Sequence, residues 1–378
     1  MDFDFSEDQE MLRDTVRRWS AKDHGFETRR AAVKAGGFSR ATWNGVAGLG
    51  VIGLAVPEAH GGLGFGPVEG MVVMEELGRG LVMEPVGQTA LVAPVVLGAA
   101  GAAGAAWLEK IAGGEAIVVL AQEERRSRYR LAHVETAARP SGDGWTLDGT
   151  KIAVPAAPHA DAFLVSARES GAVGDAAGVG LYLVEKGAPG VTVEAYPTQD
   201  GASAGSLVLV GARATRLVAP GAAIGVLEHA ADTAIAALAA EAVGAMDALV
   251  ALTVEYMNTR KQFGVPIATF QALRHRIADV KMQLELARSM GYFATLKLGE
   301  EPAARRRALS QAKVQLGTSM RFVGQQCIQL HGGIGVTEEY AASHYFKRLT
   351  VIELSFGDTL HHLGEVSARM QDTAGVFA

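Results

Sequence analysis

Residues 259–271 read TRKQFGVPIATFQ and lie between two long helical patterns. An apolar helical pattern runs into it over Ala231–Met257, and the glycine and proline inside the stretch end that helix. A second helical pattern begins at Gln271, with Thr269 placed to cap it. A helix N-terminus favours anions, and Arg260 on the preceding last turn can fork onto phosphate oxygens. By spacing alone, however, the stretch is an ordinary helix–loop–helix.

A second segment, residues 329–335, reads QLHGGIG and follows another long helical pattern over residues 303–330. Adjacent glycines end a helix and let a ligand approach the backbone closely. Alone, this is an unremarkable helix end. A last helical pattern follows Leu349. Long helices joined by short breaks indicate an antiparallel four-helix bundle over residues 221–378.

Upstream of the bundle the sequence changes character twice. Residues 1–114 have helical patterns and open with a capping box at Ser6 and Gln9. Residues 115–220 carry short β-rich apolar runs separated by turn signals, which predict an antiparallel β domain. The expected fold class is therefore α+β in three domains: an all-α domain, a middle antiparallel β domain and the C-terminal bundle. Residues 48–53 match the dinucleotide fingerprint G-x-G-x-x-G, but no strand precedes them, so we reject a Rossmann turn.

Composition excludes several classes of protein. The chain has 378 residues, 49% of them apolar, and a net charge of −6, which leaves no basic surface for nucleic acid. The histidines show no metal-ligand spacing, and the single cysteine, Cys327, is expected to be a buried small side chain. The uncharged run between Glu84 and Glu109 is rich in Ala and Gly and predicts core helices, with no membrane span. The acidic N-terminus lacks the basic region of a signal peptide, so we expect a cytoplasmic protein.

Taken together, these segments resemble the acyl-CoA dehydrogenase family. The pattern R-x-x-F-G followed by F-Q, over Arg260–Gln271, and Q-x-x-G-G-x-G, from Gln329, are similar to that family's C-terminal bundle. The P-E-x-x-G-G-x-G loop from Pro57 and the helical segment 75–79 are similar to its N-terminal domain. The resemblance covers essentially the whole chain and is weakest over residues 120–160. It is closest to the small subunits of pimeloyl-CoA dehydrogenases and related heteromeric bacterial enzymes.

The resemblance implies an FAD-dependent dehydrogenase of an acyl-CoA thioester, with an acceptor of the electron-transfer flavoprotein type. In this family FAD lies between two protomers. One protomer supplies the β domain and the catalytic carboxylate, and its neighbour supplies the two bundle motifs. The implied cofactor-binding residues are Arg260, Gln262, Phe263, Phe270, Gln271, Gln329, Gly332 and Gly333. Of these, Arg260 would clamp the pyrophosphate.

The chain departs from the family where the catalytic base belongs. Residues 355–360 read SFGDTL in place of Y-E-G-T-x-Q, so Phe356 takes the place of the glutamate. An alternative base of some members corresponds to Ala234. Two carboxylates remain as candidates for the base: Glu241, two helical turns from Ala234, and Asp358. Their alternative interpretations are structural, with Glu241 as the partner of a bundle arginine and Asp358 as the cap of the last helix.

The predicted β domain departs as well. The family's T-E-P-x-A-G-S-D is replaced near residues 121–127, and its W-I-T/S, which hydrogen-bonds the flavin, is Ala153–Pro155. Proline has no N–H to donate. The arginine-rich residues 125–130 are expected to form a solvated loop, with contact to CoA phosphates as the alternative.

The chain thus keeps the bundle motifs that would bind a neighbouring protomer's flavin, the neighbour-facing half of the flavin site. It has lost the base and the β-domain motifs that would serve its own flavin. This asymmetry predicts an α2β2 enzyme whose large subunit keeps the base. Two alternatives stay open: a self-sufficient homotetramer with a displaced base, and a catalytically silent family member that binds a protein or nucleic acid. The acidic net charge argues against nucleic acid.

Overall fold

The structure is a computed structural model that describes residues 4–370. Residues 1–3, which begin the acidic N-terminal stretch, and residues 371–378 lie outside the described residues. The chain divides into two compact units. The bundle unit comprises the described parts of residues 1–29, 71–82 and 235–378, and the sheet unit comprises residues 30–70 and 83–234. These units divide the chain differently from the three expected domains of 1–114, 115–220 and 221–378, so those boundaries stay a prediction.

The N-terminal third is helical, as predicted. Ser6 and Gln9 form the expected capping box at the start of α1, because the Ser6 hydroxyl accepts from the Gln9 N–H at 3.2 Å and the Gln9 side chain accepts from the Ser6 N–H at 3.0 Å. Helix α3 precedes residues 48–53 and a 3-10 turn closes them, which confirms that this G-x-G-x-x-G is no Rossmann turn. The α-helices are α1 (Glu7–Asp23), α2 (Phe26–Lys34), α3 (Arg40–Ala47), α4 (Pro67–Arg79), α5 (Ala93–Ala99) and α6 (Ala102–Ala112).

The sheet unit contains a seven-stranded sheet. Its strands are β1 (Val118–Ala121), β2 (Ala137–Ser141), β3 (Gly144–Pro155), β4 (Ala162–Arg168), β5 (Val179–Glu185), β6 (Val191–Pro197) and β7 (Ser203–Val218). Most pairings are antiparallel, as predicted, but β1 runs parallel to β4. The sheet closes on itself because β5 pairs with both β4 and β7. Closure buries both faces of β4, whose seven residues are all buried.

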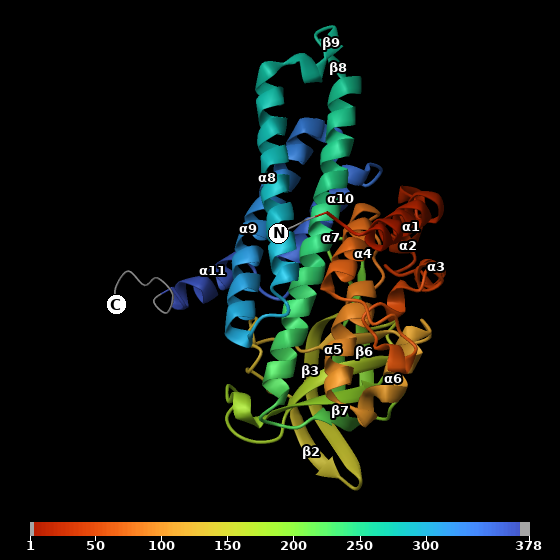
Figure 1. Ribbon diagram of the computed structural model, residues 1–378, viewed down its shortest axis with the longest axis vertical. Helices are drawn as coiled ribbons and strands as arrows, with labels where there is room; N and C mark the ends of the chain where they lie inside the picture. Colours follow the sequence, from red (N-terminus) through yellow and green to blue (C-terminus); the bar gives the residue numbers. More distant parts are fainter. Residues whose placement is uncertain (1–3, 371–378) are drawn as a thin grey trace. The chain divides into compact units, whose positions relative to one another are not determined.

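Long helices form the bundle (Figure 1). They are α7 (Ala223–Thr259), α8 (Gln271–Leu296), α9 (Pro302–His331), α10 (Ala341–Leu354) and α11 (Thr359–Ala368). Their core is mostly Ala, Val and Leu, and Cys327 is fully buried within it, as predicted. The final helical pattern was expected after Leu349, but two helices occupy this region, and α10 already begins at Ala341.

Among the described residues one helix, α7, is long and apolar enough to cross a membrane by length and composition. In the structure 72% of its most apolar window is buried inside the protein. The apolar run that the sequence analysis considered, between Glu84 and Glu109, forms a π-helical turn and the short helices α5 and α6.

Candidate functional site

A two-stranded hairpin joins α7 to α8 at one end of the bundle (Figure 1). Gln262 pairs with Val265 across β8 (Lys261–Gln262) and β9 (Val265–Pro266). The two residues between them, Phe263 and Gly264, both have positive φ, at 54° and 83°, which is the geometry of a tight type I′ turn. The N–H of Ile267 donates to the Arg260 carbonyl at 2.8 Å and closes the loop.

A small apolar cluster brings the two motif segments together. Met257 at the end of α7, Ile267 after the hairpin and Leu330 at the end of α9 are buried against one another. Helix α9 ends at His331, and Gly332 follows with a φ of +63°. No neighbouring atom lies within 4 Å of a β-carbon built on Gly332 or Gly333, so a ligand has open access to this backbone.

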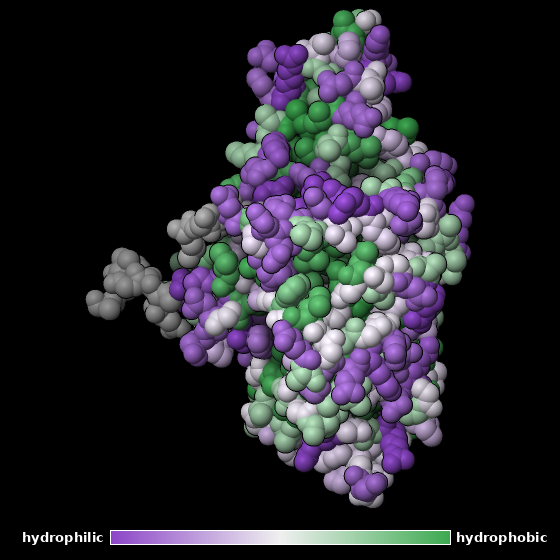
Figure 2. All heavy atoms as spheres, turned by 45° about the vertical axis from the view of Figure 1, so that its right-hand side comes forward, coloured by the Kyte–Doolittle hydropathy of each residue, from purple (hydrophilic) through white to green (hydrophobic). Residues whose placement is uncertain are grey.

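The polar side chains predicted to bind the cofactor are exposed on this end of the bundle: Arg260, Gln262, Gln271 and Gln329. Phe263 is 92% exposed, and its ring meets that of the half-buried Phe270 edge-on at 6.1 Å. A solvent-exposed aromatic on a rigid turn is costly unless a ligand or partner covers it. Figure 2 shows apolar surface at this end of the bundle.

One expected detail is wrong. Thr269 does not cap α8, because its hydroxyl donates to the Pro266 carbonyl at 2.8 Å and Phe270 occupies the N-cap position without a side-chain bond. Thr269 is instead the last residue of a 3-10 turn over Ile267–Thr269. The first N–H groups of α8 therefore have no side-chain cap at Phe270.

Sequence reasoning missed His331, the last residue of α9, which directly precedes Gly332 and Gly333. Its Nδ1 lies 2.8 Å from the Cys327 carbonyl oxygen, and its ring packs on those of Tyr256 and Tyr340, with centroids 4.7 and 5.1 Å away. Burial lowers the pKa of His331, so the ring is neutral near pH 7 and acts as an aromatic support. Only its position inside the QLHGGIG segment pointed to it.

Comparison with known proteins identifies the family. Models of the acyl-CoA dehydrogenase N-terminal, middle and C-terminal domains match residues 6–115, 120–210 and 215–371. The chain belongs to the acyl-CoA dehydrogenase family. It is 30% identical to the acyl-CoA dehydrogenase IpdE2 of Mycolicibacterium smegmatis, over 91% of this chain and 92% of that protein.

Two solved structures of the family are also similar. A variant of the steroid ACAD Tcur3481–Tcur3483 gives a TM-score of 0.86 at 30% identity and covers 98% of this chain and 99% of its own. The ChsE4–ChsE5 complex of Mycobacterium tuberculosis gives a TM-score of 0.86 at 26% identity and covers 99% of this chain and 100% of its own. The three-part fold class, helical at both ends with a β domain between, is thereby confirmed.

Acyl-CoA dehydrogenases are FAD-dependent oxidoreductases that act on CH–CH groups, and FAD is this chain's cofactor class. The bundle end fits part of that cofactor. Exposed Arg260 supplies a cation for the phosphates, exposed glutamines supply neutral donors, and the open Gly332–Gly333 backbone admits close approach.

The position that the family resemblance assigns to the catalytic base holds no carboxylate. Phe356 has a φ of +56° and lies in the loop between α10 and α11. His362 donates from Nε2 to the Phe356 carbonyl at 3.0 Å, and the Ser310 hydroxyl lies 3.2 Å from its Nδ1. His362 therefore holds this loop through the Phe356 carbonyl. The second position, Ala234, is buried and apolar.

Both candidate replacement carboxylates are engaged. Glu241 is 4% exposed and forms a bidentate pair with Arg348, at 2.5 and 2.9 Å. Asp358 accepts from the His361 N–H at 2.7 Å and caps α11. Both contacts match the structural interpretations given to these residues from the sequence.

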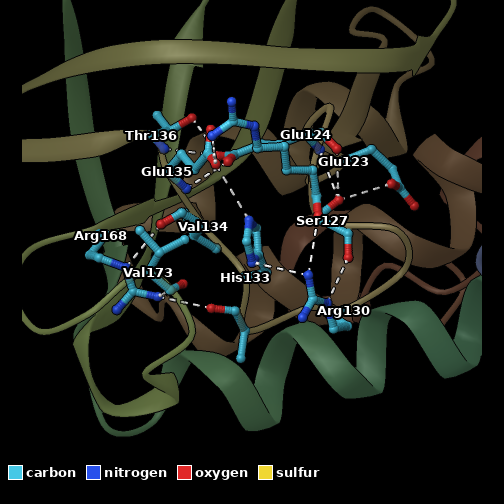
Figure 3. Close-up of polar contacts among 12 residues, drawn as sticks. Glu123, Glu124, Ser127, Arg130, His133, Val134, Glu135, Thr136, Arg168 and Val173 are labelled. Carbon is cyan, nitrogen blue, oxygen red and sulfur yellow. Dashed lines mark hydrogen bonds and ion pairs between the residues drawn. The ribbon is translucent and has the colours of Figure 1, made fainter.

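In the sheet unit, the segment that replaces the family's T-E-P-x-A-G-S-D is fixed by a buried ion pair. Lys151 on β3 is fully buried and bonds Glu124 at 2.7 Å. The Glu124 carboxylate also accepts from the N–H groups of Glu135 and Thr136 and from the Thr136 hydroxyl (Figure 3). Burial lowers the pKa of Lys151, and the Glu124 charge opposes that effect. Sequence reasoning missed this pair, because neither residue stands in a recognisable motif.

The family's flavin hydrogen bond is also replaced on β3. The Ala153 N–H donates to the Tyr196 hydroxyl at 2.8 Å, and the Ala156 N–H donates to the Ser203 carbonyl at 2.8 Å. Between them, Pro155 has no N–H. Ala153 and Ala156 both have positive φ, at 52° and 47°, so the strand end is irregular here. The backbone donors of Ala153 and Ala156 are thus already used within the protein.

Proposed function

We propose that this chain is one subunit of a heteromeric FAD-dependent acyl-CoA dehydrogenase and supplies the neighbour-facing half of the FAD site. A larger partner subunit, in an α2β2 assembly, would supply the catalytic base. The observation that carries the proposal is Phe356 at the position of the base, together with engaged carboxylates at Glu241 and Asp358.

The chemistry explains why the base matters. Bound FAD accepts the hydride that leaves the β-carbon of the acyl-CoA. Removal of the weakly acidic α-proton requires a carboxylate placed at the α-carbon. To serve, Glu241 would have to break its bidentate pair with the half-buried Arg348, which removes the charge-assisted hydrogen bonds that hold the buried Glu241 carboxylate. Asp358 would have to give up the cap of α11, at about 1 kcal/mol.

What this chain can contribute is positioning. Arg260 would hold the pyrophosphate, Gln262, Gln271 and Gln329 would hydrogen-bond, and Phe263 would pack on the cofactor. Each of these side chains is exposed, as a group that serves a neighbouring protomer must be. At the end of β3, by contrast, Ala153 and Ala156 donate internally and Pro155 cannot donate, which supports loss of the chain's own flavin half-site.

The comparisons support a heteromeric enzyme. One similar structure is titled as the ChsE4–ChsE5 complex, and another, Tcur3481–Tcur3483, is named a steroid ACAD. On that basis we propose a bulky, steroid-like acyl-CoA as the substrate class and an electron-transfer flavoprotein as acceptor. We also propose that the chain is related to the small subunits of pimeloyl-CoA dehydrogenases.

The test is to purify the chain alone and with its partner subunit, and to measure acyl-CoA dehydrogenation with an artificial electron acceptor. We expect turnover only from the co-expressed pair, because the two candidate carboxylates of this chain, Glu241 and Asp358, are held in structural contacts. Turnover by the isolated chain that Glu241→Gln or Asp358→Asn abolishes would instead establish a self-sufficient enzyme with a displaced base. A pair that binds no flavin at all would point to a silent binding protein.

A further inference from the structure

A cavity of about 260 Å³ lies within the bundle unit, where the turn between α1 and α2 meets the end of α4 and the start of α10. The described residues that line it all belong to this unit, and none of them lies in the flavin-binding segments 259–271 and 329–335. A cavity of about 150 Å³ is enough to hold benzene, so this one has room for a ligand of about ten non-hydrogen atoms.

His24, in the turn between α1 and α2, lines this cavity with an unsatisfied ring. It is 3% exposed and packs on the Trp19 ring, and neither ring nitrogen has a hydrogen-bond partner among the described residues. Burial lowers the pKa of His24, and the Leu81 main chain opposes this shift only in part, without reaching hydrogen-bonding geometry. The ring is therefore neutral near pH 7, with one N–H donor and one acceptor unused. A buried polar group without a partner is costly, so this ring calls for a ligand.

A buried guanidinium lines the same cavity. Arg29 is 1% exposed and lies close enough to His24 to oppose protonation of that ring. The Arg29 Nη1 group donates to the His344 Nδ1 atom at 2.5 Å, and the His344 Nε2 group donates to the Glu338 carbonyl at 3.1 Å. His344 thus orients the Arg29 guanidinium through a neutral imidazole.

The other charged groups of the cavity bind one another. The Glu76 carboxylate is 1% exposed and accepts two hydrogen bonds from Arg17, at 2.8 and 3.1 Å. Arg79 bonds Asp247 at 2.6 Å and lies 3.3 Å from Glu76. Among the side chains that line the cavity, three guanidinium groups therefore stand against one carboxylate. This lining favours an anionic ligand over a cationic one.

Apolar side chains contribute the remaining surface that a ligand would contact: Phe26, Leu81, Ala341 and Tyr345. The Tyr345 hydroxyl donates to the Arg79 carbonyl at 2.7 Å, so this residue offers its ring and not its hydroxyl. Apolar walls with a few placed polar groups are typical of sites for small organic molecules. An inorganic ion alone would leave these walls uncovered.

We propose that this cavity is a binding site for a small carboxylate with a short apolar tail. The His24 N–H and the Arg29 guanidinium bind the carboxylate group, and the apolar side chains cover the tail. The bound carboxylate supplies the hydrogen bond that the buried His24 ring lacks within the protein. The site is separate from the two flavin-binding segments, so its ligand binds whether or not FAD is present.

Titration calorimetry of the full chain with hexanoate tests the site without any turnover. His24→Phe keeps an aromatic ring on Trp19 and removes no hydrogen bond within the protein. We therefore expect this variant to bind hexanoate at least tenfold more weakly, with a melting temperature equal to or above that of the wild type. Ala341→Leu fills the cavity and should weaken binding to the same extent. The matched controls His275→Phe and Ala303→Leu, both exposed on other helices, should change affinity less than twofold.

Hexanamide and inorganic phosphate are the comparison probes. Each should bind at least tenfold more weakly than hexanoate, because hexanamide lacks the charge and phosphate lacks the tail. Four results overturn the proposal: no binding of hexanoate to the wild type, wild-type affinity in His24→Phe, hexanamide or phosphate bound as tightly as hexanoate, or an equal loss in Arg260→Ala. A lower melting temperature of His24→Phe with unchanged hexanoate affinity would make His24 a purely structural residue. Because the readout is direct binding at residues outside the flavin-binding segments, failure here leaves the dehydrogenase assignment untouched.

Discussion

Arg260 lies just after the 37-residue helix α7, on the exposed end of the bundle. If it clamps the pyrophosphate of an FAD held mainly by another protomer, Arg260→Ala should loosen FAD in the assembled enzyme at least tenfold. The estimate follows from about 1.5–3 kcal/mol for a hydrogen bond to a charged group. Arg260→Lys should restore part of the affinity, because an ammonium lacks the planar fork. The flavin occupancy of the co-expressed enzyme measures the effects of Arg260→Ala and Arg260→Lys.

The matched control for Arg260 is its neighbour Lys261, which is also exposed and cationic but lies on the hairpin strand β8. Lys261→Ala should retain FAD to within about twofold, since a surface cation without a direct contact contributes little. The melting temperature of the isolated chain should hardly change in either variant. Equal retention of FAD by wild type and Arg260→Ala would show that Arg260 is an ordinary surface residue.

His362 makes the bundle unit sensitive to acid. Burial lowers its pKa to about 3, and its neutral ring bridges Ser310 and the Phe356 carbonyl. The unfolded chain binds this proton near pH 6.5 and the folded chain only near pH 3, so between those values the unfolded state holds more protons. The free energy of unfolding should therefore fall as pH drops from 6.5, by up to about 1.4 kcal/mol per pH unit from this group.

Urea titrations between pH 7 and pH 4 check this. His362→Gln should be less stable at pH 7 but show a shallower decline with acid than the wild type. As control, His275→Gln alters an exposed histidine of α8 and should leave the slope unchanged. Parallel pH profiles for wild type and His362→Gln would contradict the assignment.

Two glycines, Gly78 and Gly244, set the distance between α4 and α7 in the bundle unit. A β-carbon on Gly244 would lie 1.8 Å from the Glu75 carbonyl oxygen, and one on Gly78 would lie 2.0 Å from the Glu241 carbonyl oxygen. The two backbones touch directly, which side chains would prevent. This contact also places Glu241 where Arg348 can reach it.

Gly244→Ala should therefore destabilise the chain by about 3 kcal/mol or more, because the obstacle is backbone and cannot move aside. Gly225→Ala on the same helix is the matched control: it is exposed, with no atom within 4 Å of an added β-carbon. There the substitution should stabilise by about 0.5–1 kcal/mol through the unfolded state. Urea unfolding distinguishes them, and equal effects at the two positions would refute close packing at Gly244.

The whole assembly has a different ratio of FAD to protein chains in the heteromeric and the homotetrameric enzyme. An assembly in which only the partner offers a complete β-domain half-site should hold about one FAD for every two chains, in keeping with its symmetry. A homotetramer with a site in each chain should hold about one FAD per chain. Flavin absorbance against protein concentration in the purified assembly decides between them.

Local sequence patterns were enough to predict the fold class, and they identified the two bundle motifs whose segments pack together in the structure. Helical and strand periodicities follow from local geometry, so the bundle, the β domain and the capping box at Ser6 were all predictable. The R-x-x-F-G and QLHGGIG segments were recognisable because a turn and a close backbone approach require particular residue types. The absence of a glutamate at Phe356 is likewise a fact of the sequence alone.

Which polar groups have partners follows from contacts that form only when distant parts of the chain fold together. The pairs Glu241–Arg348 and Lys151–Glu124 join residues 107 and 27 positions apart, and no local pattern encodes such partners. Whether a carboxylate is buried and neutralised depends on helices and strands that meet only after folding.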